Sequence, residues 1–131
     1  MTSLFSKIIA GEIPSYKVCE NDKFYSFLDI NPMAEGHVLI VPKIEVDYLF
    51  DLDDELLAEM IIFAKHIAKG MQQAVPCKRV GMMVIGMEVP HAHIHLIPIN
   101  KESDMNLTNP KLKPSKEDFE MIAQKIRNNI E

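Results

Sequence analysis

The segment HAHIHLIPI, residues 91–99, constrains the fold of this chain more than any other part of the sequence. Three histidines alternate there with Ala92, Ile94 and Leu96. Successive side chains of a β-strand point to opposite faces of a sheet. The alternation therefore predicts a strand over 92–97 with imidazoles on one face and apolar side chains on the other.

The remaining elements are predicted from shorter patterns. Apolar residues at helical spacing predict a short helix from Leu4 that stops at Gly11. A long helix is expected within 51–75, where acidic residues precede an apolar stripe with the period of an α-helix. The β-prone runs predict strands over 16–19, 24–28, 36–41 and 80–85. The stripe consists of Leu56, Leu57, Met60, Ile61, Ala64, Ile67, Ala68 and Met71.

The chain after residue 100 is polar and loop-like as far as Pro114. Ser115 and Asp118 then have the spacing of a capping box, which predicts a final amphipathic helix. Its apolar residues are Phe119, Ile122, Ala123, Ile126 and Ile130. Because the predicted strands are joined mostly by tight turns, we expect antiparallel pairing with helices packed on one face, which is an α+β domain.

Composition restricts the function classes. A chain of 131 residues favours one domain, and its net charge of −5 provides no general attraction to nucleic acid or anionic lipid. There is no apolar run of about 18 residues that would span a membrane, and the first residues do not resemble a signal peptide. The two cysteines, Cys19 and Cys77, are too few to form a disulfide framework. So few cysteines favour a reducing compartment. We therefore expect a cytoplasmic protein.

Three explanations fit the row of imidazoles. A solvent-facing strand could contain histidines, although threonine, lysine or glutamate would serve as well. Two histidines on one strand face can ligate zinc or iron, but residues 96–100 supply no carboxylate nearby. Imidazole can also act as nucleophile, base or acid near neutral pH. Crowding is then expected to leave a neutral, nucleophilic ring beside a protonated ring that binds an anion.

Residues 91–97 resemble the His-φ-His-φ-His-φ-φ signature of the histidine triad (HIT) family of nucleotide hydrolases and transferases. The segments FSKIIAGEIPSYKV, FLDINPMAEGHVLIVPK and EVPHAHIHLIP are similar to the family in the family's order, and they span most of residues 3–99. The resemblance implies a single HIT domain over 1–131, with a core at 3–99 and a C-terminal loop and helix at 100–131.

The fold implied by this resemblance is HIT-like, with a five-stranded antiparallel sheet, a short N-terminal helix, a long central helix and a C-terminal helix. Members of the family are usually homodimers.

The resemblance also implies roles for individual residues. His93 would be the nucleophile that attacks the α-phosphorus of a nucleotide and forms a nucleotidyl-imidazole intermediate. His91, His95 and His37 would orient it, bind phosphate oxygens and relay a proton. Asp29 matches the residue that hydrogen-bonds the ribose hydroxyls, for which a carboxylate is suited. The positions matching the base pocket are Leu4, Phe5, Ile8, Ile13, Phe27 and Ile30.

One departure from the family concerns a metal. Many microbial relatives hold zinc with a C-x-x-C pair near the start, a histidine after Pro-Lys and a triad-side histidine. Ser3, Ser6 and Glu45 occupy the first three of these positions here. Serine hydroxyls are poor zinc ligands, so we expect no metal and no cofactor.

A second departure lies in the loop before the triad. The segment VIGMEVPHAHIH is several residues shorter than in the family, and Met87 stands where a glutamine commonly helps to hold phosphate. A thioether cannot donate a hydrogen bond. The backbone N–H groups of Glu88 and Val89 are candidates to replace that amide, and the Glu88 carboxylate favours a cationic leaving group such as an amine.

These observations predict an enzyme that cleaves purine nucleoside 5'-phosphoramidates or adenylylated small molecules at the α-phosphate. A dinucleoside polyphosphate hydrolase is the alternative within the same chemistry, and a nucleotide-binding module with little catalysis is the alternative outside it. A purine nucleotide and a second copy of the chain are the expected partners, whereas nucleic acid and membranes are not.

Overall fold

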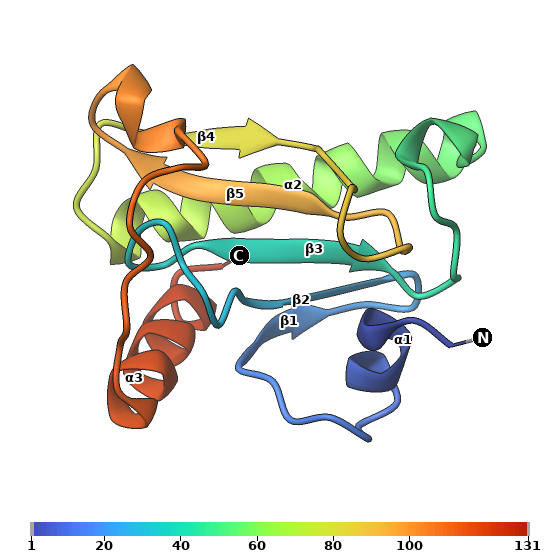
Figure 1. Cartoon of the computed structure of the whole chain (residues 1–131), viewed down its shortest axis with the longest axis horizontal. Coiled ribbons are helices and arrows are strands. Elements are labelled where there is room, and N and C mark those ends of the chain that lie inside the picture. The colour runs from blue at the N-terminus through green and yellow to red at the C-terminus, as the bar shows by residue number, and fades with distance from the viewer. Residues whose placement is uncertain (1, 131) are drawn as a thin grey trace.

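The computed structural model describes residues 2–130 and is built on one five-stranded sheet (Figure 1). The strand order is β1-β2-β3-β5-β4, and all four neighbouring pairs are antiparallel. The strands are β1 Lys17–Glu20, β2 Phe24–Leu28, β3 Val38–Pro42, β4 Arg79–Met83 and β5 Ile94–Ile99. The predicted α+β class and the five-stranded antiparallel sheet are confirmed.

Each α-helix begins at a residue whose side chain caps it. Ser3 accepts a hydrogen bond from the Ser6 N–H, Asp53 accepts one from Leu56, and Ser115 accepts one from Asp118. The capping box predicted at Ser115 and Asp118 is confirmed. The helices are α1 Leu4–Ile9, α2 Asp54–Ala74 and α3 Lys116–Arg127, with 3-10 turns η1 Leu49–Asp51 and η2 Glu102–Met105. Within residues 2–130, no helix is both long and apolar enough to cross a bilayer.

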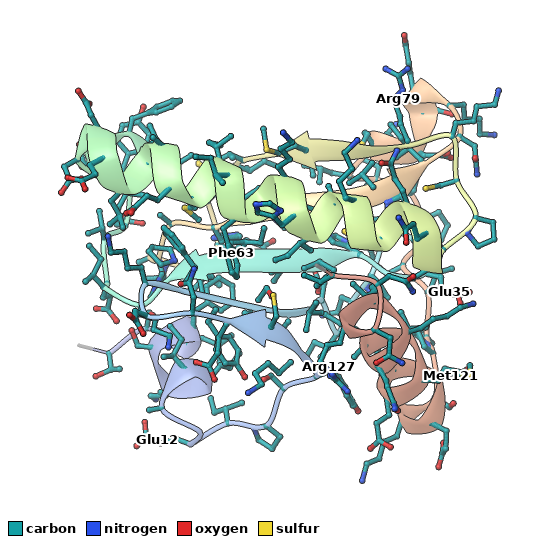
Figure 2. The ribbon with its side chains drawn as sticks, turned by 180° about the vertical axis from the view of Figure 1, so that it is seen from behind. Glu12, Glu35, Phe63, Arg79, Met121 and Arg127 are labelled. Atoms are coloured by element: carbon teal, nitrogen blue, oxygen red, sulfur yellow. The ribbon has the colours of Figure 1, made fainter. Side chains whose placement is uncertain are left out.

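The helices cover both faces of the sheet, whereas the sequence analysis placed them on one. Helices α2 and α3 pack on one face, and Figure 2 shows α2 lying across it. Helix α1 packs on the opposite face, because Phe5 and Ile8 join a separate buried cluster there. The strand residues of this α1-face cluster are Tyr25, Phe27, Leu39 and Val41.

Alternation along the central strands separates the two faces. In β3, Val38 and Ile40 enter the main core, while Leu39 points to the α1 face. In β5, Ile94 and Leu96 enter the same main core, and His95 is paired with Leu39. Burying each such apolar side chain contributes about 1.5–3 kcal/mol, so the core fixes the face on which His95 emerges.

The observed elements differ from the predicted ones in four places. Strand β5 starts at Ile94 rather than at Ala92, because the Ala92 N–H donates to the carbonyl of Val46 instead of to a strand partner, at 2.7 Å. Strand β4 ends at Met83, and the chain then turns through 84–93 in front of β3 (Figure 1). Ile61 of the predicted stripe is 41% exposed. Ile130 lies beyond α3.

Gly36 ends the turn between β2 and β3, directly before His37. Its φ is +87°, a conformation that L side chains rarely adopt. A Cβ atom on Gly36 would lie 2.9 Å from Cγ2 of Val75. Both the backbone conformation and the close approach therefore favour glycine here.

We expect Gly36→Ala to lower the free energy of unfolding by about 2–5 kcal/mol, because it adds both backbone strain and overpacking. Urea denaturation measures the loss. Gly11→Ala is the matched control, since Gly11 has φ +81° but no atom within 4 Å of the added Cβ. That variant should lose only about 1–2 kcal/mol. Equal losses in the two variants would show that contact with Val75 costs nothing.

Candidate functional site

Four histidines line up on the α1 face of the sheet. The ring centroids of His93 and His95 are 5.0 Å apart, and those of His37 and His95 are 5.2 Å apart. Phe5 of α1 contacts the row edge-on, at 4.9 Å from His93 and 5.9 Å from His91. The structure therefore brings together all four histidines singled out in the sequence, although His91 and His93 precede β5 rather than lying within it.

The hydrogen bonds around the rings define where each neutral imidazole carries its proton. The Met33 N–H donates to Nδ1 of His37 at 3.1 Å, so the His37 proton lies on Nε2. That Nε2–H donates to Nδ1 of His95 at 3.0 Å, which places the His95 proton on Nε2. Nδ1–H of His93 donates to the backbone carbonyl of His91 at 2.7 Å. The lone pair of His93 therefore lies on Nε2, away from that bond.

His91 is held on both sides of its fully buried ring. Its Nε2–H donates to the carbonyl of Pro42 at 2.8 Å, and its Nδ1 accepts from the Ser3 hydroxyl at 2.7 Å. Pro42 ends β3 and Ser3 caps α1, so the His91 ring connects the sheet to the N-terminal helix. This ring is not free to meet a ligand.

Ser3, Ser6 and Glu45 meet beside His91. Oε1 of Glu45 accepts from the Ser3 N–H at 2.6 Å and from the Ser6 hydroxyl at 2.7 Å. These are the positions at which the family resemblance points to zinc. Zinc does not fit this donor set, because hydroxyls are poor zinc ligands and these polar atoms already hydrogen-bond to one another.

Burial disfavours the charged form of three imidazoles of the row. It lowers the pKa of His37 to about 3 and that of His95 to about 4, and a neighbouring histidine adds to each shift. Burial also lowers the pKa of His93. A neutral ring beside a protonated one was expected from crowding. Burial opposes such a pair among His37, His93 and His95, because desolvation penalises the charge on each of these three rings.

Asp29 lies at the end of the histidine row. Its Oδ2 is 3.6 Å from Nε2 of His37, and its Oδ1 accepts from the Asn31 N–H at 2.8 Å, which forms an Asx turn. Burial raises its pKa. Among residues 2–130, Asp29, His37 and His95 are the one group of three or more metal-ligating side chains, with ligand atoms within 4.8 Å of one another. A metal there would have to replace the His37–His95 hydrogen bond.

The predicted base-pocket residues fall into two groups. Phe5, Ile8 and Phe27 belong to the α1-face cluster, and Ile13 packs against it together with Val89. Leu4 and Ile30 are 47% and 65% exposed and lie outside this cluster. Four of the six residues therefore gather at the α1-face cluster, and the other two lie outside it. Ile30 instead borders a cavity of about 560 Å³ between residues 14–17 and α3, which none of the histidines lines.

The shortened loop places Glu88 near the row of rings. Its negative charge raises the pKa of both His93 and Asp29, although burial has the larger effect on each pKa. Met87 is 86% exposed, so the side chain that replaces the family glutamine points into solvent. Val89 is the residue of this loop that packs onto the α1-face cluster.

The loop at 106–114 lies near the histidine row, and no sequence pattern pointed to a particular residue in it. Figure 1 shows it passing the turn between β2 and β3, where the Leu112 N–H donates to the carbonyl of Pro32 at 2.9 Å. Lys111 donates to two carbonyls of its own loop, those of Leu107 and Asn109. After burial and its histidine neighbour, the Lys111 charge also lowers the pKa of His37. A lysine in a polar loop has no periodicity that would have identified it.

Comparisons with known proteins agree with this geometry. The sequence model of the HIT domain matches residues 10–102. Adenosine 5'-monophosphoramidase HNT1 of Saccharomyces cerevisiae is 43% identical over 100 residues, which cover 76% of this chain and 63% of the yeast protein. Adenosine 5'-monophosphoramidase hnt1 of Schizosaccharomyces pombe is 30% identical over 133 residues and 99% of each chain.

A solved structure has the same fold. The crystal structure of a Hit-like protein involved in cell-cycle regulation from Bartonella henselae superimposes with a TM-score of 0.85 and 33% identity, over 98% of this chain and 96% of that one. The aligned part of this chain spans less than two thirds of the length of the Saccharomyces cerevisiae protein.

The lowered pKa of His37 predicts that acid destabilises the fold. A histidine in the unfolded chain has an ordinary pKa of about 6.5, whereas folded His37 binds a proton only near pH 3. Between these values the unfolded state binds more protons, so the free energy of unfolding falls as the pH drops below about 6.5. Urea denaturation at two pH values, about 7 and about 5, should show this loss.

Replacement of the ring should reduce that loss. We expect His37→Asn to diminish the difference between the two pH values by up to about 2 kcal/mol. His66→Asn, on the exposed side of α2, is the matched control and should leave it unchanged. If the free energy of unfolding of His37→Asn differs between the two pH values as much as that of the unmodified protein, His37 is not buried in its neutral form.

Proposed function

The chain belongs to the HIT domain family, and from that premise we propose that it hydrolyses purine nucleoside 5'-phosphoramidates at the α-phosphorus. One observation carries the proposal. The bond from Nδ1–H of His93 to the His91 carbonyl leaves Nε2 of His93 as a nucleophile with a free lone pair. The two yeast relatives named adenosine 5'-monophosphoramidase support a phosphorus–nitrogen bond as the target.

The reaction proceeds in two displacements at phosphorus. Nε2 of His93 forms a bond to the α-phosphorus while the bond from phosphorus to the leaving nitrogen breaks, and the leaving nitrogen takes the electron pair and a proton. Water then attacks the nucleotidyl-imidazole and loses one proton to solvent, which releases the nucleoside monophosphate and restores neutral His93. The lowered pKa of His93 supports this role, because the ring stays neutral and nucleophilic at neutral pH.

The other histidines act on the phosphate and on the proton. The Met33–His37–His95 chain of hydrogen bonds directs Nε2–H of His95 away from His37, as a donor for a phosphate oxygen. Nδ1 of His95 accepts the His37 proton and cannot take a second one, so the leaving nitrogen takes its proton from solvent. His91 contributes its backbone carbonyl, which accepts Nδ1–H of His93.

The nucleoside is bound beside this row. Asp29 accepts hydrogen bonds from the ribose hydroxyls, which its position next to His37 supports. Phe5, Ile8, Ile13 and Phe27 form the wall for the base, together with Val89. Leu4 and Ile30 are exposed outside this wall, and their contact with the base rests on the family resemblance alone.

Glu88 selects the leaving group. It is exposed in the loop before the triad, and its charge acts on the pKa of His93 and of Asp29. A carboxylate at this place attracts an amine and repels the further phosphates of a dinucleoside polyphosphate. This favours phosphoramidates over the alternative substrate class.

The proposal predicts that the protein cleaves adenosine 5'-phosphoramidate faster than diadenosine tetraphosphate. His93→Ala should lower the rate on both substrates by at least about a thousandfold, because the nucleophile is missing. Initial rates of nucleoside monophosphate release, followed by chromatography, measure both effects.

His66→Ala is the control, because His66 lies on α2 and matches no motif position. Full activity in His93→Ala would show that His93 is not the nucleophile. A preference for the tetraphosphate would support the dinucleoside polyphosphate hydrolase instead. Tight binding of the monophosphate in calorimetry without turnover of either substrate would support a binding module.

We further propose that the chain acts as a single HIT domain in the cytoplasm. Support for one domain comes from α3, whose Phe119, Ile122 and Ile126 belong to the same core as the strands. Support for the compartment comes from Cys19 and Cys77, which are both free thiols and suit a reducing environment.

We also propose that the protein is a homodimer. Strand β4 is an edge of the sheet, so one side of it has no partner strand within the described residues. Apolar side chains are exposed along it and just after it, with Met82 53%, Val84 42% and Ile85 40% exposed. An apolar edge strand of this kind favours pairing with a second copy.

Light scattering is therefore expected to give twice the chain mass of 14.9 kDa. Val84→Lys should shift the mass toward the monomer, because it places a charge at the edge. Met121→Lys on α3 is the matched control, since Met121 is 60% exposed and far along the chain from β4. A monomeric mass for the unmodified protein at micromolar concentration would contradict the dimer.

A further inference from the structure

Three residues tie the start of α1 to the triad, and we name Ser3, Ser6 and Glu45 the α1 clamp. Oε1 of Glu45 accepts from the Ser3 N–H and from the Ser6 hydroxyl, at 2.6 and 2.7 Å. The Ser3 hydroxyl accepts from the Ser6 N–H at 3.0 Å. It also lies 2.7 Å from Nδ1 of His91. The clamp therefore links a loop after β3, the N-terminus of α1 and a buried histidine.

The direction of each bond follows from the number of protons. A carboxylate only accepts, so the Ser6 hydroxyl proton goes to Glu45. Nε2–H of His91 faces the Pro42 carbonyl, which leaves Nδ1 as the acceptor on this ring. The single hydroxyl proton of Ser3 must then go to Nδ1 of His91. The Pro42 carbonyl thus fixes the tautomer of His91, and the Ser3 hydroxyl holds the orientation of its ring.

The clamp acts on His93 by two routes. The first is the backbone of His91, whose carbonyl accepts Nδ1–H of His93 at 2.7 Å. The second is Phe5, which α1 places edge-on against His93 with ring centroids 4.9 Å apart. A shift of α1 would move the acceptor of the His93 proton and the wall against which its ring packs.

The charge of Glu45 makes the clamp permanent over a wide pH range. Hydrogen bonds from the Ser3 N–H and from the Ser6 hydroxyl lower the pKa of Glu45 to about 2. The carboxylate is exposed, yet it remains ionised and able to accept both bonds throughout the range in which His93 is neutral.

We propose that Ser3, Ser6 and Glu45 are positioning residues for His93, a hydrogen-bonded clamp at the place where the family resemblance points to zinc. The inference rests on the proposed function, because it names what aligns the same nucleophile. The donor set supports it, since every bond of the clamp uses a hydroxyl, a backbone N–H or a carboxylate, and none of them requires a metal.

The test compares variants that remove or keep the Ser3 hydroxyl. Ser3→Ala removes the donor to His91 and should lower kcat by about 10- to 100-fold with little change in KM, because a misplaced nucleophile affects the chemical step. Ser3→Thr keeps a hydroxyl and should retain most of the activity. Glu45→Ala should resemble Ser3→Ala, and Glu45→Gln, which keeps an acceptor oxygen, should lose less.

Ser115→Ala is the matched control. Ser115 caps α3 by the same bond with which Ser3 caps α1, but it does not contact the triad. Loss of a cap alone lowers stability in both helices. A fall of kcat in Ser3→Ala but not in Ser115→Ala would therefore separate positioning from helix stability.

A second readout does not depend on turnover. Long-range ¹H–¹⁵N spectra of the imidazoles report the tautomer of each ring in the substrate-free protein. We expect the Nδ1–H form of His93 in the unmodified protein and in Ser3→Thr, and a mixture of tautomers in Glu45→Ala and Ser3→Ala. If Ser3→Ala does not fold, Glu45→Ala at the exposed end of the clamp provides the same comparison.

These readouts separate the two proposals. An unmodified protein without phosphoramidase activity would overturn the proposed function, while the spectra would still test the clamp. Conversely, full kcat and an unchanged His93 tautomer in both Ser3→Ala and Glu45→Ala would overturn the clamp and leave the proposed function standing. Stoichiometric zinc that is lost together with kcat in Glu45→Ala would also overturn it.

Discussion

The hydrogen bond from Nδ1–H of His93 to the carbonyl of His91 is the constraint on which the rest of the site depends. A neutral imidazole has one proton and one lone pair, so this bond decides that Nε2 carries the lone pair. It also requires His91 and His93 to leave the regular strand pairing, because a carbonyl within a ladder would face a neighbouring strand. The start of β5 at Ile94 is thus a requirement of the site, rather than an irregular end of the sheet.

Burial gives the row of rings its second property. The apolar neighbours that exclude water from His37, His93 and His95 also disfavour a proton on them, and each has a lowered pKa. The fold therefore holds uncharged imidazoles side by side. In the proposed reaction, one of them donates Nε2–H to the phosphate, and another attacks phosphorus without first losing a proton.

The sequence predicted the parts of this arrangement that depend on local periodicity. Alternation in β5 indicated on which face His95 emerges, and spacing in α2 and α3 indicated their buried sides. Contacts between distant segments have no such signal. Ser3 and Glu45 are 42 positions apart and meet only because α1 folds back over the sheet. Lys111 lies near Asp29 because a backbone bond joins Leu112 to Pro32, and Phe5 leaves the predicted helix-bearing face because Tyr25 and Phe27 offer apolar surface opposite.

The two faces of the sheet are stabilised in different ways, which bears on how such a site can change. The face covered by α2 and α3 has a large apolar core that tolerates conservative replacements of similar volume. The α1 face has a small cluster, and α1 has only six residues, so directional hydrogen bonds add to the buried contacts of Phe5 and Ile8 in holding it in place. Hydrogen bonds specify a position within a few tenths of an ångström, whereas apolar contacts do not. The proposed nucleophile His93 needs that precision, so we expect one substitution among the polar residues around α1 to alter the chemistry while leaving the sheet intact.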